Sequence, residues 1–361
     1  MRYKFSDLYY DDTKNAKKLK SSEYKNVGKH IIVDQGKALI AGYTDNEDGL
    51  YTDVPAIIFG DHTRNIKYID SPFFLGADGT KVLKSPVKNV NYKYLYYLLK
   101  NASIPDTGYN RHFKWLKELI FKYHSQEQQN QIVTILDKLD LTITKYREEL
   151  SLLDELAKAR FVEMFGDPVT NDMLWNTDVL KDICTKIGSG STPRGGKESY
   201  IDEGISLIRS MNVHNAYFEY KDLAHITLDQ AEKLNNVVVE HDDLLFNITG
   251  ASVARCCVVP SGVLPARVNQ HVCILRCREK INPIFLQGLL VNENYQGKLL
   301  QIAKSGATRE AINKQQLESL EIMIPPLELQ NQFASFVQEI DKSRLRELLA
   351  IKHIKLLLKN L

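Results

Sequence analysis

The chain lacks several features that define large protein classes. No apolar run in its 361 residues approaches the ~18 residues that a membrane-spanning helix needs. The N-terminal MRYKFSDLYYDD has no apolar core of a secretory signal, so we expect a cytoplasmic protein. The composition, 43% hydrophobic and 25% charged, is that of an ordinary globular protein, and the length allows two domains.

Cysteine is scarce, with five residues in the chain. The odd number argues against a closed disulfide framework. Cys256 and Cys257 are adjacent, and Cys273 and Cys277 are four apart, so the two C-x-x-C pairs of a typical zinc site are missing. A metal site is the minor alternative. The spacing favours small buried thiols, Cys184 included, in a reducing compartment.

A strong excess of charge of one sign is also absent. The net charge is +2 and the pI is about 8.1, whereas the pI of a DNA-binding domain often exceeds about 9. Residues 125–165 hold five Lys/Arg and eight Asp/Glu, a net charge of −3, which leaves +5 for the rest of the chain. Charge alone therefore does not identify a nucleic-acid binder.

What the chain does contain is a long internal repeat. HSQEQQNQIVTILDKLD, from His124, matches PPLELQNQFASFVQEID, from Pro325, without a gap. The matched positions, 201 residues apart, are Glu127 with Glu328, Gln129 with Gln330, Asn130 with Asn331, Gln131 with Gln332 and Asp140 with Asp341. This spacing is far longer than that of a solenoid repeat, so it indicates duplication of a whole domain.

The segments before this match also correspond. YKYLYYLL, from Tyr92, resembles PIFLQGLL, from Pro283, and each precedes a polar loop with an arginine, TGYNRH at 107–112 and SGATRE at 305–310. Each copy is thus interpreted as a globular unit, a short strand and a long helix. We predict domains at 1–124 and 166–324, a central helix at 125–165 and a C-terminal helix at 325–361.

The two predicted helices are long and amphipathic. Residues 127–165 contain no Pro or Gly, and their apolar residues alternate at spacings of four and three, which is a heptad pattern. At 1.5 Å per residue such a helix is about 58 Å long. We expect the helices to pair antiparallel, because a free helix of this length leaves its apolar stripe uncovered. The alternative is that each helix packs only on its own domain.

Several motifs in these modules resemble one known family. The second module contains WNTDVLKDICTKIGSGSTPRGG from Trp175, VVVEHDDLLFNITGASVARC from Val237 and PARVNQHVCILR from Pro265. It resembles a target-recognition domain of type I restriction enzyme specificity subunits. The first module, with VDQGK from Val33 and IIFGDHT from Ile57, together with FFLGADGTKVL and GYNRHFKWLKE, resembles another variant of that domain. The helices resemble the family's spacers, so the resemblance covers essentially the whole chain.

The resemblance implies both a fold and a function. The fold would be mixed α/β (α+β), with two target-recognition domains separated by two antiparallel coiled-coil helices in a pseudo-twofold repeat. The function would be to bind a bipartite double-stranded DNA target and to direct adenine methylation or restriction by partner subunits. Those partners would be two modification (methyltransferase) subunits and the restriction subunits. S-adenosylmethionine, ATP and magnesium would belong to the partners, leaving this chain without a cofactor.

Two departures from the family pattern stand out. The last helix has no counterpart of RFVEMFGDP, which closes the first helix. The two modules also differ strongly from each other, which implies that they read different half-sites.

Two other functions are compatible with parts of the sequence. A fused methyltransferase or nuclease would need catalytic motifs, and the nearest string to [N/D]-P-P-[Y/F] is Asn282-Pro-Ile-Phe285, which we interpret as a helix start. A protein–protein adaptor would need no DNA-binding loops. Salt-dependent DNA binding would separate the adaptor from the specificity subunit.

The candidate DNA-contacting residues lie at predicted strand ends and turns. Arg pairs with guanine and Asn or Gln pairs with adenine through two hydrogen bonds each, while glycine-rich loops suit phosphate contacts. In the first module the candidates are Gln35, His62, Lys67, Asp78, Tyr109, Arg111 and His112. In the second they are Ser189, Ser191, Thr192, Arg194, Arg209, Asn247, Thr249, Arg255, Arg267, Asn269, Gln270, His271, Thr308 and Arg309. The alternatives are a mobile surface loop at 188–196 and turn residues that satisfy only the backbone.

Overall fold

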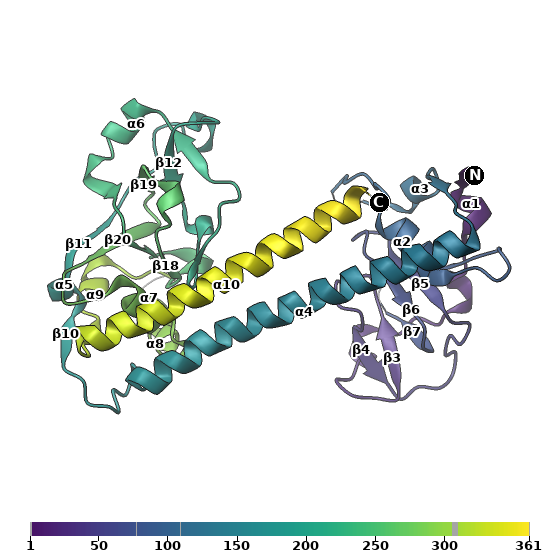
Figure 1. The fold of residues 1–361 in the computed structure, drawn as a ribbon, viewed down its shortest axis with the longest axis horizontal. Coiled ribbons are helices and arrows are strands. Elements are labelled where there is room, and N and C mark those ends of the chain that lie inside the picture. Colours follow the sequence, from purple (N-terminus) through teal and green to yellow (C-terminus); the bar gives the residue numbers. More distant parts are fainter. Residues whose placement is uncertain (1, 77, 109, 305–309, 361) are drawn as a thin grey trace. The chain divides into compact units, whose positions relative to one another are not determined.

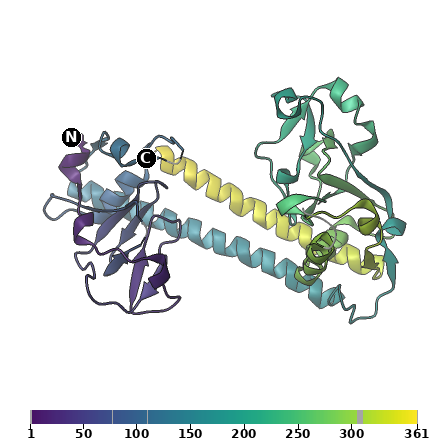
Figure 2. The same cartoon turned by 180° about the vertical axis from the view of Figure 1, so that it is seen from behind.

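The computed structural model describes residues 2–76, 78–108, 110–304 and 310–360. The chain divides into two units, Met1–Arg147 with Leu349–Leu361 and Glu148–Leu348, here called the first and second unit (Figures 1 and 2). Each long helix contributes residues to both units. Among the described residues, no helix combines the length and apolar character needed to span a membrane.

The first unit contains two sheets and a short strand pair. An antiparallel sheet has the strand order β2-β8-β5-β6, and a second sheet has the order β4-β3-β7 with β3 and β7 parallel. The strands are β1 (Arg2–Lys4), β2 (Tyr10–Asp11), β3 (His30–Val33), β4 (Gly42–Thr44), β5 (Ala56–Gly60), β6 (Ile66–Ile69), β7 (Phe73–Leu75), β8 (Thr80–Lys84) and β9 (Ile120–Lys122). The helices are α1 (Phe5–Leu8), α2 (Tyr92–Lys100), α3 (Phe113–Leu116) and α4 (Gln126–Phe165), with 3-10 turns at Thr13–Asn15 and Ser21–Glu23.

The second unit repeats this plan with additions. Its sheets have the orders β11-β20-β17-β18 and β15-β12-β19-β16, and β12 and β19 are the parallel pair. The strands are β10 (Thr177–Val179), β11 (Cys184–Ser189), β12 (Ile205–Ile208), β13 (Val213–His214), β14 (Tyr217–Phe218), β15 (Ala224–Ile226), β16 (Val238–Val239), β17 (Leu244–Asn247), β18 (Cys256–Val258), β19 (Ala266–Val268), β20 (Val272–Cys277) and β21 (Glu321–Met323). The helices are α5 (Leu180–Ile183), α6 (Leu228–Glu232), α7 (Pro283–Val291), α8 (Glu293–Lys304), α9 (Lys314–Glu318) and α10 (Leu327–Asn360). The 3-10 turns are Gly196–Ser199, Ser210–Asn212, Asn235–Val237, Gly250–Ser252 and Ser261–Val263.

The cores explain why the sheets take this order. Alternate residues of a strand point to opposite faces. Ile57 and Phe59 of β5 therefore pack with α2 and the start of α4, whereas Ile58 packs against the second sheet. In β17, Phe246 faces the helices and Leu245 faces the second sheet in the same way. Each unit is thus a layer of helices, a sheet and a second sheet, which confirms the predicted mixed fold and the duplication.

Near the start of each long helix lies a buried glutamine, Gln129 or Gln330, which the two copies of the repeat share. Gln330 is fully buried, its Nε2 donates to the Pro325 carbonyl at 2.8 Å, and its Oε1 accepts from the Asn282 amide at 2.8 Å. Gln129 is also buried, and its Nε2 donates to the His124 carbonyl at 2.9 Å. Most buried amide groups are hydrogen-bonded, and these bonds fix the first turn of each long helix against its own unit.

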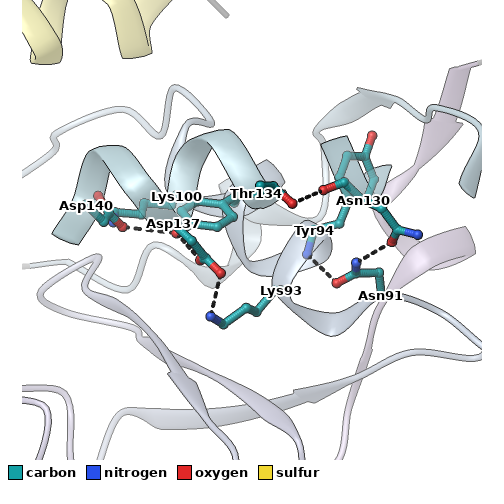
Figure 3. Close-up of polar contacts among 9 residues, drawn as sticks. Asn91, Lys93, Tyr94, Lys100, Asn130, Thr134, Asp137 and Asp140 are labelled. Atoms are coloured by element: carbon teal, nitrogen blue, oxygen red, sulfur yellow. Dashed lines mark hydrogen bonds and ion pairs between the residues drawn. The ribbon is translucent and has the colours of Figure 1, made fainter. Parts of the chain in front are cut away.

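A pair of asparagines makes an equivalent contact beside each glutamine. Asn91 and Asn282 cap α2 and α7. The side-chain amide of Asn91 donates to Asn130 Oδ1 at 3.1 Å (Figure 3). The side-chain amide of Asn282 donates to Asn331 Oδ1 at 2.9 Å. The cap of the shorter helix thereby binds the long helix. This contact accounts for the Gln-Asn pair that both halves of the sequence share.

The long helices pair antiparallel, as predicted. In the second unit, Phe161 and Phe165 of α4 pack on Phe333 near the start of α10, and Arg344 pairs with Asp154. In the first unit, Leu358 near the end of α10 packs against the cluster that includes the start of α4. The helix α4 ends at Phe165, and the next residue, Gly166, has a φ of +75°, which suits glycine.

We predict that Gln330→Ala lowers the free energy of unfolding by about 2–4 kcal/mol, because buried groups lose their hydrogen bonds. Gln129→Ala should cost less, about 1 kcal/mol, since the Gln129 Oε1 atom has no hydrogen-bond partner among the described residues. Gln332→Ala is the control, because this exposed neighbour should change stability by less than about 0.5 kcal/mol. Urea unfolding measures all three, and equal effects at positions 330 and 332 would contradict the assignment.

Candidate nucleic-acid interface

In the second unit, the ends of several strands converge on one edge. β11 ends beside the start of β20, where Ser189 pairs with Cys273, and β17 ends there too, where Asn247 pairs with Val272. The parallel strands β12 and β19 end at the same edge, because the Asn269 amide donates to the Ile208 carbonyl at 3.0 Å. We call residues 189–194, 209–212, 247–255 and 269–271 the second recognition edge.

Four polar side chains on this edge form a continuous string. Thr192 donates through its hydroxyl to Gln270 Oε1, and Gln270 Nε2 lies 3.0 Å from His271 Nε2. His271 Nδ1 lies 2.6 Å from Thr249 Oγ1. An amide nitrogen only donates, so His271 Nε2 accepts and Nδ1 carries the proton. The string joins three connections that are far apart in the sequence.

Three candidates on or near this edge have structural contacts instead. Asn247 is fully buried, and its Nδ2 donates to the Ser210 carbonyl at 2.9 Å. Asn269 is buried, and its Oδ1 accepts from the His271 amide at 3.0 Å. Arg267 points away toward α6, where its Nε donates to the Ala231 carbonyl at 3.1 Å. Asn247 and Asn269 therefore bond to the backbone of the turns, and Arg267 bonds to the end of α6.

The remaining second-unit candidates are accessible to different degrees. Ser189, Ser191 and Arg194 are exposed, and the Arg194 guanidinium makes no hydrogen bond or ion pair with any described residue. Arg209 is half-buried, donates to the Asp222 carbonyl and lies over the Tyr200 ring at 5.5 Å. Thr308 and Arg309 lie outside the described residues.

The β13–β14 hairpin brings two residues to this edge that the sequence analysis missed. His214 stacks on Tyr217, with ring centroids 4.5 Å apart and planes 8° apart, and Arg255 Nη1 lies 3.4 Å from His214 Nδ1. Tyr217 is 50% exposed. The only signal was the short V-H-N-A-Y-F segment, which has no strand pattern long enough to stand out.

The equivalent edge of the first unit gathers Gln35, His62 and Asp78. Gln35 Oε1 accepts from the His62 amide at 3.2 Å, and Gln35 Nε2 donates to the Asp78 carbonyl at 2.9 Å. The Gln35 carbonyl also accepts from the Thr63 hydroxyl at 2.6 Å. Gln35 therefore ties three connections into one surface, which we call the first recognition edge.

The loop that contains Arg111 is anchored on the first recognition edge. The His112 amide donates to the Asp61 carbonyl at 2.8 Å, and Asp106 pairs with Arg64 at 2.5 Å. The Gly108 amide and the Arg64 guanidinium hold the pKa of Asp106 below its usual value. Arg111 is exposed, and its guanidinium has no polar contact with the described residues. Tyr109 lies outside the described residues.

Two first-unit candidates lie in the interior. His112 is fully buried, and its Nδ1 lies 3.0 Å from the Asp61 carbonyl oxygen. Lys67 points between the sheets, where its side chain is 5% exposed and its Nζ lies 3.5 Å from Asp34. Their positions correct the expectation that these side chains face DNA. Alternation along β6 places Lys67 inward, and no pattern in the sequence indicates a lysine on a buried face.

The buried cysteines and Asn282 lie in the settings that the sequence predicts. Cys184, Cys256, Cys257 and Cys273 are buried free thiols, and burial raises the pKa of Cys257 and of Cys273 to about 12. Asn282 caps α7 and accepts from the Ile284 amide at 2.9 Å, so the Asn-Pro-Ile-Phe string is a helix start, as predicted.

Comparisons with known proteins identify the class as one of DNA specificity proteins. The model of the type I restriction modification DNA specificity domain matches residues 173–353, half of the chain. The Escherichia coli type I restriction enzyme EcoR124I/EcoR124II specificity subunit is 21% identical over 90% of this chain and 82% of its own. The putative type I restriction enzyme MjaX specificity subunit of Methanocaldococcus jannaschii is 24% identical over 46% of this chain and 39% of its own.

A solved structure shares the fold over the full length. The crystal structure of the type I restriction-modification system S subunit from M. genitalium is similar with a TM-score of 0.62 and 15% identity, over 100% of this chain and 94% of that one. The chain belongs to the family of DNA specificity subunits of type I restriction–modification systems.

We predict that Lys67→Met raises the free energy of unfolding at pH 7 by about 1 kcal/mol, because it removes an amine buried without a hydrogen bond. Burial lowers the pKa of Lys67, so the folded protein holds this proton less tightly than the unfolded chain. The gain should therefore be full below the folded pKa and vanish as the pH rises toward 10.5. Urea unfolding across pH measures this, and a loss of stability would contradict it.

Proposed function

We propose that the chain binds a bipartite DNA target, with one half-site read by each recognition edge. The observation that supports this most is that both units build the same edge from one topology and place different side chains on it. The backbone contacts are equivalent: the Asp61 amide donates to the Gly79 carbonyl at 2.7 Å, and the Ile248 amide donates to the His271 carbonyl at 3.0 Å. One scaffold with two sets of side chains suits a split, asymmetric target.

The accessible part of the candidate set carries this proposal. It comprises Gln35, His62, Asp78 and Arg111 in the first unit and Ser189, Ser191, Thr192, Arg194, Arg209, Thr249, Arg255, Gln270 and His271 in the second. Exposed arginines suit phosphate or guanine contacts, and the amide and hydroxyl groups suit base edges. Tyr109 stays a candidate because it belongs to the same sequence loop as Arg111. The matching loop of the second module contains Thr308 and Arg309, which therefore stay candidates too.

The chemistry would belong to partner subunits. Two modification subunits would bind this chain and methylate an adenine in each half-site, with S-adenosylmethionine as their cofactor, and restriction subunits would join with ATP and magnesium. This chain would catalyse no step and hold no cofactor, and the complex would act in the cytoplasm. The long helices, which both units share, would set the nonspecific spacer between the half-sites. The adaptor alternative is not favoured, because the family is one of DNA specificity subunits.

Methylome sequencing tests this proposal in a methylation-free host that expresses the chain with its modification subunit. We expect methylated adenines in one split motif. Arg111→Ala should weaken base selection in one half of the motif. Arg194→Ala should weaken base selection only in the other half, or lower the affinity for DNA. At any base that is contacted, the preference for that base should fall about 5- to 150-fold.

Matched controls lie at the opposite end of each sheet. Lys88 and Arg278 are exposed and follow the far ends of β8 and β20. Lys88→Ala and Arg278→Ala should leave the motif and the methylation level unchanged. A stable complex that methylates no split motif would overturn the bipartite proposal.

A further inference from the structure

One turn occupies the same place on both recognition edges. In the first unit it joins β7 to β8, and the Gly76 amide donates to the Val33 carbonyl at 2.8 Å. In the second unit it joins β19 to β20, and the Asn269 amide makes the same bond to the Ile208 carbonyl. Both turns connect the second sheet to the first. The exposed polar side chain at the tip is Asp78 in one unit and Gln270 in the other.

The amide of Gln270 is held in one orientation. Its Oε1 accepts from the Thr192 hydroxyl, and its Nε2 donates to His271, whose other ring nitrogen is bonded to Thr249. One N–H and one lone pair on Oε1 remain for a ligand. An adjacent donor and acceptor of this kind match N7 and the N6 amino group of adenine.

Asp78 presents the opposite chemistry on the corresponding turn, which is one residue longer in the first unit and where Asp78, like Gln270, directly precedes the residue whose carbonyl accepts from the neighbouring connection. Its side chain is 98% exposed, and Lys18 Nζ contacts Oδ1 at 3.0 Å. The second carboxylate oxygen makes no hydrogen bond with a described residue. An ionised carboxylate accepts only, and the matching donor in the major groove is the N4 amino group of cytosine.

The side chains of Gln270 and Asp78 together indicate that this turn contacts bases and not phosphates. A phosphate would be repelled by the Asp78 carboxylate, so a turn that faced the DNA backbone in both units would not carry one. A residue needed only for folding would be buried or bonded on both sides, as Asn269 is. Gln270 and Asp78 instead keep free hydrogen-bonding groups on exposed side chains.

We propose that this turn is a specificity-determining position in each unit, with Gln270 reading an adenine in one half-site and Asp78 reading a cytosine in the other. The inference rests on the proposed function, since it assigns bases within the two half-sites. The turn itself is held by backbone bonds between strands, so its side chain can differ without changing the edge.

The test is methylome sequencing of the chain and its modification subunit with single substitutions. Gln270→Met should lower the preference for adenine at one position about 5- to 150-fold and leave the other half-site unchanged. Gln270→Glu should move that preference toward cytosine, because it replaces the N–H donor by an acceptor. Asp78→Asn should move the preference from cytosine toward adenine in the opposite half-site.

The controls separate this inference from the proposed function. Asp48→Asn removes a surface ion pair with Lys17 in the same unit and should leave the motif intact. If the unaltered chain directs no methylation, the proposed function fails. If it does, but the substitutions at 270 and 78 lower methylation evenly over all sites or leave the motif unchanged, the base-reading assignment is overturned. The untouched half-site reports that each variant is folded.

Discussion

The structure depends on a buried amide at the start of each long helix. Gln330 bonds both to the Pro325 carbonyl before its own helix and to the backbone amide of Asn282 at the start of α7, and these bonds satisfy a side chain that water cannot reach. The neighbouring Asn331 binds the cap of α7. A helix is rigid over many turns, so fastening its first turn sets the direction in which the rest leaves the unit. The Gln-Asn pair that both copies share therefore fixes the orientation of each long helix on its own unit.

The two units secure the same helix contact with different chemistry. In the first, Lys93 pairs with Asp137 at 2.7 Å and Lys100 pairs with Asp140 at 2.5 Å, beside the buried Tyr97 (Figure 3). In the second, aromatic rings from α4, α7 and α10 pack together, with Phe165 and Phe285 centroids 4.8 Å apart. The aromatic cluster should be insensitive to salt, whereas the partly exposed ion pairs are screened. Duplication preserved the amide contact and let the surrounding packing diverge.

Much of the fold could be predicted from the sequence because the relevant signals are periodic or repeated. The heptad spacing gave the long helices, and the offset between Gln129 and Gln330 gave the duplication. The recognition edges were harder. Candidates were chosen by residue type near strand ends, and this rule cannot tell an exposed Gln270 from a buried Asn247 or Lys67. That distinction depends on strand register and on which sheet covers each face, and short irregular strands carry too little pattern to reveal either.

The separation between scaffold and reading surface explains how one fold serves two unlike sequences. The edge backbone is satisfied by bonds between strands and by the side chains of Gln35 in one unit and Asn269 in the other. At Gly79, the position equivalent to His271, an added Cβ would lie 2.7 Å from His62 Cδ2, so a ring from a neighbouring connection fills that place. Each unit thus builds the same surface with different residues. Because exposed side chains on such a surface contribute little to stability, the bases they contact can change while the fold persists.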